Sequence, residues 1–192
     1  MSLDRPTRVA LLTNVLAPYR LPVYRDLANT PGWELRVMAS KRAEAGFGRA
    51  QEGAFEAAAQ VLDVELVKGL SFRRRVSTNG KVDGSQWLET HLPVGVLPAL
   101  ARFRPDVIVS GELGVRSALA ALYATLSGVP LVLWSYHSRS AAVAMGPLRR
   151  ALARPLIARA RTVAGMGTQA REVLRELGAP NTSIFDAPNA HD

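Results

Sequence analysis

Two ionisable residues of this sequence stand directly after apolar runs, where a buried strand would deliver them to its end. His137 follows the apolar run 130–135, and Glu112 follows the run 106–110 and lies beside Gly111 and Gly114. An imidazole can hydrogen-bond a hydroxyl or a phosphate and can take up a proton near neutral pH. His137 is therefore our candidate catalytic residue, and its alternative is a loop histidine that ties neighbouring backbone together. Glu112 can bind hydroxyls or cap the helix that follows it.

Three more polar residues occupy comparable positions. Arg20 and Arg139 can bind phosphate, although in so arginine-rich a chain each can equally be a surface residue. Asn14 ends the first apolar run and can either touch a ligand or support the backbone of its loop. These residues predict a site that recognises hydroxyl groups or phosphates.

Several common catalytic and nucleotide-binding motifs are absent. Residues 14–18 lack the Gly-x-Gly-x-x-Gly spacing that lets a backbone approach a pyrophosphate, and residues 165–167 lack the third glycine. No Gly-Lys-Ser/Thr follows a strand, and Ser110 is not in a nucleophile elbow. The sequence therefore disfavours dinucleotide binding, a P-loop ATPase and a serine hydrolase.

The positions of Asn14 and Arg20 depend on the stretch from residue 8 to residue 28. Within the predicted strand at residues 8–13, residues 9–12 are all apolar, which is typical of a strand buried on both faces of a parallel sheet. The run breaks at Asn14, Pro18 holds the following loop, and Leu21, Tyr24 and Leu27 then recur at helical spacing. The stretch predicts a strand, a loop directed at the ligand and a helix.

Strands and helices are expected to alternate along the rest of the chain. We predict further strands at residues 33–40, 61–67 (near the sheet edge), 106–110, 130–135, 162–166 and 183–186. We predict further helices at residues 93–103, 115–126 (ending at Gly128), 147–159 and 168–177 (capped by Thr168 and ending at Gly178). Residues 41–54 are expected to be a loop with at most a turn of helix, and residues 69–86 a long, basic connection.

This alternation predicts a three-layer α/β, Rossmann-like domain with a mainly parallel sheet of about seven strands. All strand carboxyl ends of such a sheet lie on one edge, and ligands bind there where the strand order reverses. The residues expected at that edge are 14–19, 40–42, 110–114, 136–139 and 165–168. Four of the candidate residues named above, Asn14, Glu112, His137 and Arg139, are therefore expected at one edge without any assumption about function, and Arg20 follows that edge by one residue.

Composition limits the class of protein further. The chain has 192 residues, of which 48% are hydrophobic, and it has no cysteine and three histidines, so thiolate chemistry is excluded and little room is left for a metal site. No apolar run approaches the roughly 20 residues of a membrane-spanning helix, and no signal-peptide core is present.

The formal charge of +8 would attract nucleic acid, an anionic membrane or a phosphorylated ligand. No aromatic ladder interleaves the arginines, so we expect no nucleic-acid partner. The basic helix at 147–159 and the basic residues at 73–81 could attract an anionic membrane. Their alternative is a solvated surface in an arginine-rich chain.

Several segments together resemble a known family. They are residues 14–27 with Ala-Pro-Tyr-Arg, the Arg-Pro-Asp-Val-Ile-Val-Ser-Gly strand at 104–111, the strand at 128–134 followed by His137, and the terminal residues 184–192 with Pro-Asn-Ala-His-Asp. In this order and spacing the chain resembles the N-terminal domain of a GT-B fold glycosyltransferase of the family-4 (group 1) type. Members of that family make bacterial polysaccharides and glycolipids.

The resemblance implies a domain organisation and an activity. Residues 4–187 would form the acceptor-binding domain and residues 188–192 the start of the interdomain hinge, with the C-terminal donor domain absent from the chain. The parent enzyme would be a cytoplasmic retaining transferase, or one peripheral to the inner face of the cell membrane. It would move a sugar from a nucleotide sugar, its co-substrate, to a sugar or lipid-linked acceptor without another cofactor. The isolated domain would be inactive.

The resemblance and the edge of the sheet together select the site residues. His137 would be catalytic, and the substrate-binding residues would be Asn14, Ala17, Pro18, Tyr19, Arg20, Gly111, Glu112 and Arg139. The family's first loop is often glycine-rich, and the loop at 14–18 has no glycine. Two alternatives remain at this point: a stand-alone binding module for a phosphosugar or other anionic ligand, and half of another GT-B enzyme such as a sugar-nucleotide epimerase.

Overall fold

The computed structural model of the chain describes residues 5–40, 48–76, 86–135, 147–180 and 183–187. Its main sheet has seven parallel strands in the order β3-β2-β1-β6-β7-β8-β9. These strands are β1 (Thr7–Thr13), β2 (Trp33–Ala39), β3 (Asp63–Leu66), β6 (Val107–Ser110), β7 (Leu131–Ser135), β8 (Thr162–Gly165) and β9 (Ile184–Asp186). The expected Rossmann-like sheet is confirmed, with β3 at one edge.

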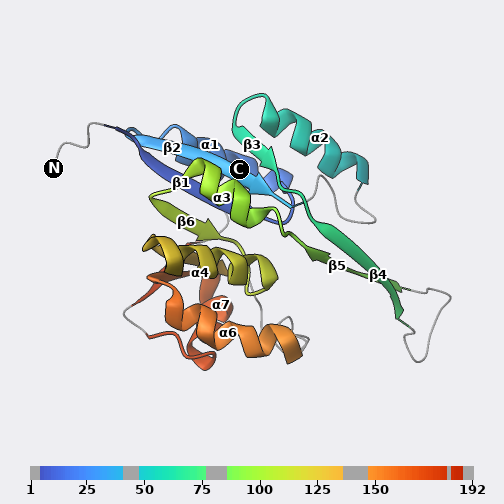
Figure 1. Ribbon diagram of the computed structural model, residues 1–192, viewed down its shortest axis with the longest axis vertical. Coiled ribbons are helices and arrows are strands. Elements are labelled where there is room, and N and C mark those ends of the chain that lie inside the picture. Colours follow the sequence, from blue (N-terminus) through green and yellow to red (C-terminus); the bar gives the residue numbers. More distant parts are fainter. Residues whose placement is uncertain (1–4, 41–47, 77–85, 136–146, 181–182, 188–192) are drawn as a thin grey trace.

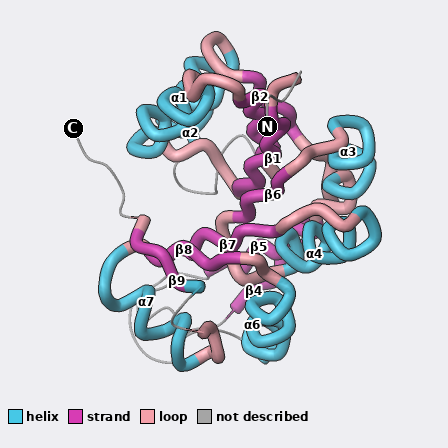
Figure 2. Tube along the Cα trace, turned by 90° about the vertical axis from the view of Figure 1, so that its left-hand side faces the viewer, coloured by secondary structure: helices cyan, strands magenta, loops and turns pink. Residues whose placement is uncertain are grey.

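Helices cover both faces of this sheet, as Figure 2 shows in a view along its layers. On one face lie α1 (Leu21–Ala28) and α2 (Gly48–Ala59), and on the other lie α3 (Val96–Phe103), α4 (Val115–Ser127) and α6 (Pro147–Arg159). The helix α7 (Gly167–Glu176) packs on β8 and β9. No helix in the described part of the chain is long and apolar enough to cross a membrane.

The central strand β1 explains why the sheet needs helices on both sides. Its buried residues alternate between two hydrophobic cores: Val9 and Leu11 pack beneath α1 and α2, whereas Ala10 and Leu12 pack beneath α3 and α4. Successive side chains of a strand point to opposite faces, so an uninterrupted apolar run is buried only if both faces are covered. The strand ends at Thr13, one residue before Asn14, as expected.

Two segments differ from the expectations. Residues 48–54, expected in a loop, belong to the twelve-residue helix α2. Residues 69–86 were expected to be a long, basic connection, but they contain the strand β4 (Leu70–Val76), which forms an antiparallel pair with β5 (Gln86–Leu92), in register from Leu70 opposite Leu92 to Val76 opposite Gln86. This hairpin forms a separate two-stranded sheet that leaves the body beside β3 (Figure 1).

Helix ends follow the predicted glycines but not the predicted cap. Gly128 and Gly178 have the left-handed backbone angles, φ 71° and φ 99°, that end α4 and α7. Thr168 lies inside α7, whose N-cap residue is Met166 with no side-chain capping hydrogen bond. The prediction that Thr168 caps this helix was therefore wrong, and the helix begins at Gly167, one residue before its predicted start.

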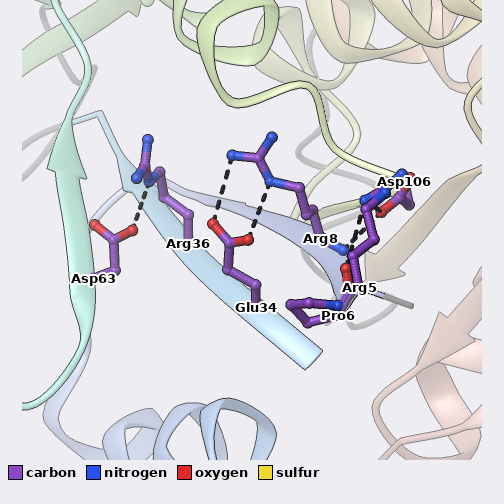
Figure 3. Close-up of polar contacts among 7 residues, drawn as sticks. All are labelled: Arg5, Pro6, Arg8, Glu34, Arg36, Asp63 and Asp106. Carbon is purple, nitrogen blue, oxygen red and sulfur yellow. Dashed lines mark hydrogen bonds and ion pairs between the residues drawn. The ribbon is translucent and has the colours of Figure 1, made fainter. Parts of the chain in front are cut away.

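The amino ends of the strands are joined by charged side chains (Figure 3). We call these residues the amino-end network: Arg5, Arg8, Glu34, Arg36, Asp63, Glu65, Arg102 and Asp106. The Arg5 guanidinium pairs with both carboxylate oxygens of Asp106 at 2.7 and 2.8 Å, and the Arg8 backbone N–H donates to the same carboxylate at 2.8 Å. Arg8 also pairs with Glu34 at 3.2 Å. The network ties β1, β2, β3 and the start of β6 together.

Candidate functional site

The strand order reverses between β1 and β6, which both leave the sheet at the same edge. We call this edge the carboxyl rim and define it by residues 14–19 after β1, Ser40 after β2, residues 111–114 after β6 and Met166 after β8. Backbone hydrogen bonds hold its loops together: the Gly111 N–H donates to the Leu12 carbonyl at 3.0 Å, and the Ser40 N–H donates to the Thr13 carbonyl at 3.1 Å. The rim is therefore a direct continuation of the sheet, and the expected position for a ligand in this class of fold.

The loop after β1 is held by its own side chains and by proline. The Thr13 hydroxyl donates to the Val15 carbonyl at 3.0 Å, and Leu16 is completely buried. The short helix η1 (Pro18–Arg20) follows, with Ala17 as its N-cap residue and Tyr19 exposed. Its Arg20 N–H donates to the Ala17 carbonyl at 2.9 Å. Asn14, Ala17 and Tyr19 thus lie at the rim as the sequence predicted.

This loop offers fewer backbone donors than a glycine-rich phosphate loop. Pro18 and Pro22 have no N–H, and the N–H groups of Arg20 and Leu21 already donate to the carbonyls of Ala17 and Pro18. Anion binding at a helix start depends on N–H groups that point at the ligand. Recognition at this part of the rim must therefore come mainly from side chains.

Arg20 is buried, with 7% of its side chain exposed, and so is not the ordinary surface arginine that the sequence left open. Its guanidinium lies 5.4 Å from the centre of the Trp134 ring and 5.6 Å from that of Tyr19, and its Nη2 lies 3.9 Å from the Met166 sulfur. Arginine stacks well on aromatic rings because it is planar and weakly hydrated. Arg20 thereby joins the first loop to the ends of β7 and β8.

The loop after β6 carries Glu112, and the structure shows what positions its carboxylate. Glu112 Oε1 lies 2.9 Å from Nη2 of Arg116, one turn along, and Arg116 Nη1 donates to the Ser40 hydroxyl at 3.0 Å. Only 3% of the Arg116 side chain is exposed. Arg116 therefore connects the loops after β2 and β6 and fixes the orientation of Glu112.

A second set of hydrogen bonds shapes the same loop from below. The hydroxyls of Ser110 and Ser117, both buried, lie 2.7 Å apart, and the Ser117 hydroxyl donates to the Glu112 carbonyl. The loop lies against β1 at Gly111, where a Cβ would lie 3.4 Å from the Leu12 carbonyl oxygen, an ordinary van der Waals contact. Glu112 is thus half-buried, and both its backbone carbonyl and its carboxylate are held in place. A group that orients a ligand hydroxyl must be fixed in this way.

The predicted site residues separate into three groups. Asn14, Ala17, Pro18, Tyr19, Gly111 and Glu112 lie in the rim loops; Arg20 lies beside them but is buried; His137 and Arg139 lie outside the described residues. Ser135, the last residue of β7, is buried and accepts a hydrogen bond from the Met166 N–H at 3.0 Å. His137 and Arg139 therefore stay predictions, placed two and four residues beyond a strand end at the rim.

Sequence reasoning missed two residues that support the rim, Arg116 and Trp134. Arg116 follows Glu112 by four residues, a spacing that favours an ion pair, but its contact with Ser40 crosses between strands that are distant in the sequence. Trp134 was visible only as the end of an apolar strand, and its Nε1 donates to the Ala187 carbonyl at 3.4 Å. No sequence signal pairs it with Arg20.

The described groups whose pKa is shifted, Asp106 and Arg5, lie at the opposite end of the strands from this rim. The Arg5 guanidinium, which donates to Asp106, and the Arg8 backbone N–H lower the pKa of the Asp106 carboxyl, and Asp106 raises the pKa of Arg5. Among the described residues, no group of three or more His, Asp or Glu side chains is arranged to hold a metal ion.

Solved structures with a similar fold include three bacterial proteins. The TM-scores are 0.65 for Anabaena HepE in complex with UDP and glucose, 0.58 for UDP-GlcNAc 2-epimerase from Neisseria meningitidis bound to UDP-GlcNAc, and 0.53 for Acinetobacter baumannii MurG. Each is 13% identical in sequence, and the matches cover 96–97% of this chain but only 45–47% of those chains. The chain thus spans about half the length of these proteins and folds like one Rossmann-like half of the GT-B fold.

Sequence comparison identifies the family. No curated protein matches the chain. The family model described as glycosyl transferase 4-like domain matches residues 16–190, which begin within the loop after β1 and include the other six strands of the main sheet. By this match the chain belongs to the glycosyl transferase 4-like domain family.

Proposed function

We propose that this chain is the acceptor-binding half of a retaining glycosyltransferase that takes its sugar from a nucleotide sugar. The observation that carries the proposal is the rim at the reversal of strand order, where Glu112 is held by Arg116 and the preceding residue, Gly111, is hydrogen-bonded to the end of β1. A fixed carboxylate can accept a hydrogen bond from a sugar hydroxyl. Family membership supports transfer of a sugar as the reaction.

In this proposal each part of the rim has its own task. Glu112 and Asn14 orient the acceptor, and Arg116 and Ser40 keep Glu112 in position without touching the ligand. His137 lines the reaction centre as the catalytic residue, and Arg139 interacts with the departing diphosphate, whose developing charge needs nearby donors and cations. Arg20 supports the first loop from within, because its side chain is packed on Trp134.

The donor nucleotide sugar is assigned mainly to a second α/β half. The similar solved structures are about twice the length of this chain, which supports a partner half of comparable size. The prolines and engaged N–H groups of the first loop also argue against a strong phosphate site on this half. By itself the chain would then bind acceptor sugars but catalyse no transfer.

Ligand-observed NMR on the purified chain tests this proposal. We expect saturation transfer to oligosaccharides and a weaker signal from UDP-sugars. Glu112→Gln should reduce oligosaccharide affinity about fivefold, because a charged hydrogen bond is replaced by a neutral one. The matched control is Glu176→Gln, which lies at the far end of α7 and should leave the affinity unchanged.

The competing function is a sugar-nucleotide epimerase, favoured by the likeness to the Neisseria enzyme bound to UDP-GlcNAc. An epimerase needs no acceptor, so the chain would then bind the UDP-sugar and no free oligosaccharide. That pattern of binding would replace our proposal. For the enzyme with its second half, the anomeric configuration of the product, measured by proton NMR, tests the retaining stereochemistry.

A further inference from the structure

The helix α4 has a solvent-facing surface that no charged residue interrupts. Its one charged residue, Arg116, is 3% exposed and belongs to the carboxyl rim. Leu122 and Leu126 are 48% and 79% exposed, and Thr125 beside them is exposed as well. A helix that is apolar on its outer face as well as its inner face is usually covered on both sides. The outer face of α4 is therefore a candidate interface.

The apolar residues on this face follow the spacing of a coiled coil. Val115, Leu119, Leu122 and Leu126 are separated by four, three and four residues. At about 100° per residue they lie within a stripe roughly 60° wide. Val115 and Leu119 are half-buried, so the stripe becomes more exposed towards the end of the helix. We call these four residues the α4 stripe. Such a stripe can pack against a second helix with the same spacing.

The neighbouring helices continue this surface with small, uncharged side chains. The helix α4 lies between α3 and α6 and packs on both (Figure 2). The exposed small residues are Pro98 and Ala101 on α3 and Ala151, Pro155 and Ala158 on α6. Three adjacent helices therefore present an outer layer with the leucines of α4 at its centre.

Two exposed arginines of α6 lie on the side of that helix turned away from α4. The side that meets α4 is marked by Arg159, whose Nε donates to the Thr125 hydroxyl at 2.6 Å. At about 100° per residue, Arg154 lies roughly 140° and Arg150 roughly 180° around the helix from Arg159. An anionic partner seated on the α4 stripe would therefore meet few cations. The stripe fits an apolar, uncharged occupant better.

We infer that the α4 stripe docks on the α4 stripe of a second copy of this chain, in an antiparallel pair about a two-fold axis near Leu122. Interfaces between identical subunits are more apolar than other interfaces, and charged residues are depleted at their centres. A two-fold axis brings the same patch of both copies together, so a self-complementary stripe is sufficient. The inference goes beyond the proposed function and does not depend on it.

The charges near the stripe favour the antiparallel orientation. Because the strands of the main sheet are parallel, α3, α4 and α6 all end at the amino ends of the strands that follow them. Arg104 after α3 and Arg159 at the end of α6 therefore lie at the same end of the layer as Leu126. A parallel pair would bring these arginines of both copies together. An antiparallel pair about Leu122 separates the two Leu126 residues by about 12 Å along the helix axis and keeps the arginines apart.

The outer layer is large enough for a stable pair. A helix of 13 residues is about 20 Å long, and three neighbouring helices about 8–10 Å apart are roughly 25 Å wide. The footprint is then about 500 Å² seen flat, and the relief of the side chains makes the accessible surface larger. Stable interfaces bury about 800 Å² of accessible surface per partner. The layer of α3, α4 and α6 is thus of the size that a dimer needs.

Analytical ultracentrifugation of the full chain tests the inference. We expect a monomer–dimer equilibrium in which the dimer becomes tighter as salt is added. Salt screens the repulsion between two chains of net charge +8, whereas the burial of apolar surface is kept. A chain that stays monomeric up to about 200 μM, or a dimer that salt dissociates, would overturn the inference.

Paired substitutions locate the interface. Leu122→Gln with Leu126→Gln removes apolar area from the α4 stripe and keeps a good helix former at both positions, so it should raise the dimer dissociation constant at least about thirtyfold. Leu70→Gln with Phe72→Gln is the matched control, because these two side chains are 54% and 59% exposed on β4, and it should change the constant less than about twofold. Equal effects from the two pairs, or a larger effect from the control, would place the contact elsewhere and overturn the inference.

Cross-linking reports the orientation and does not depend on weakening the dimer. Because the chain has no cysteine, a single introduced cysteine shows which positions of the two copies face each other. A residue near the two-fold axis lies opposite its own counterpart, so a short bismaleimide should link Leu122→Cys efficiently. Leu126→Cys should be linked several-fold less, and Leu70→Cys should show only the background of random collisions. Linking at position 126 that equals or exceeds that at position 122 would contradict the antiparallel pair.

Discussion

The carboxyl rim and the amino-end network both depend on arginines, but they bury them to very different degrees. At the rim, 3% of the Arg116 side chain and 7% of Arg20 are exposed. At the opposite end of the strands, 63% of the Arg5 side chain is exposed, and Arg8 and Arg36 are half-buried. The same residue type therefore meets two different environments at the two ends of one sheet.

This difference determines what each arginine contributes. A buried cation has lost its water, so its protein partners must replace that hydration, and removing the cation leaves those partners desolvated. When one member of an exposed ion pair is lost, water replaces it at little cost in free energy. We therefore expect the rim arginines to control local geometry. We expect each amino-end arginine to contribute little to the free energy of unfolding, because neighbouring partners can substitute for one another.

The largest effect is expected from Arg116→Met. It removes the cation of Glu112 and the donor to the Ser40 hydroxyl, and should lower the free energy of unfolding by about 2–3 kcal/mol. Urea denaturation measures this change. The control is Arg102→Met, which removes an exposed arginine paired with Glu65 and should cost less than about 0.5 kcal/mol. Equal losses in the two variants would remove the distinction between the two ends of the sheet.

The next largest effect is expected from Arg20→Met. It keeps the apolar stem but loses the guanidinium stacked on Trp134, and should cost about 1–2 kcal/mol. Arg20→Lys retains the charge without the planar group. Its free energy of unfolding, measured by urea denaturation, should lie between those of wild type and Arg20→Met. Arg25→Met, on the exposed side of α1, is the control. A fully stable Arg20→Met protein would show that the stack does not hold the first loop.

Asp106→Asn tests the amino-end network through its dependence on pH. The pKa of Asp106 is lowered by the hydrogen bond from the Arg5 guanidinium and by the Arg8 N–H, so the folded state favours the ionised carboxyl. Its contribution is complete above the unfolded-state pKa of about 4 and is lost as the pH falls through the lower folded-state pKa. After allowance for solvent, Asp106→Asn should cost about 0.5–1 kcal/mol at pH 7.

The acid limit distinguishes this linkage from simple loss of packing. When the stability of both proteins is followed by urea denaturation from neutral to acid pH, the difference between wild type and Asp106→Asn should shrink towards zero. A difference that stays constant would mean that the carboxyl acts through its shape and not through its charge.

The main sheet was predictable because its strands are short apolar runs that end in recognisable turns. Residues 9–12 and 107–109 have no polar interruption, and only a strand covered on both faces explains them. The hairpin was missed because its strands carry arginine, threonine and glutamine and lack a core that would impose a pattern. The helix α2 was missed because glycines at 46, 48 and 53 read as a loop, whereas burial of Phe55 and Ala58 stabilises the helix.

The candidate site was predictable only as far as strand ends determine it. Asn14 and Glu112 follow strands and so had to lie at the rim, whatever the strand order. The contacts of Arg116 with Ser40 and of Arg20 with Trp134 depend on which strands are neighbours, and one sequence does not specify that. His137 and Arg139 rest on the same strand-end argument, and the described residues leave them as predictions.

The smallest effect is expected from Asp63→Asn, which tests whether neighbouring ion pairs at the amino ends can substitute for one another. Arg36 pairs with Asp63 at 2.7 Å, but it also lies 3.9 Å from Glu65 and 4.6 Å from the centre of the Phe103 ring. Because these contacts and water hold the guanidinium when one carboxylate is lost, the single change should cost less than about 0.5 kcal/mol in urea denaturation. If Glu65 compensates for Asp63, then Asp63→Asn combined with Glu65→Gln must cost more than the sum of the two single changes. A strictly additive double variant would mean that each pair acts alone, and that the tolerance of this end comes from solvent and not from shared partners.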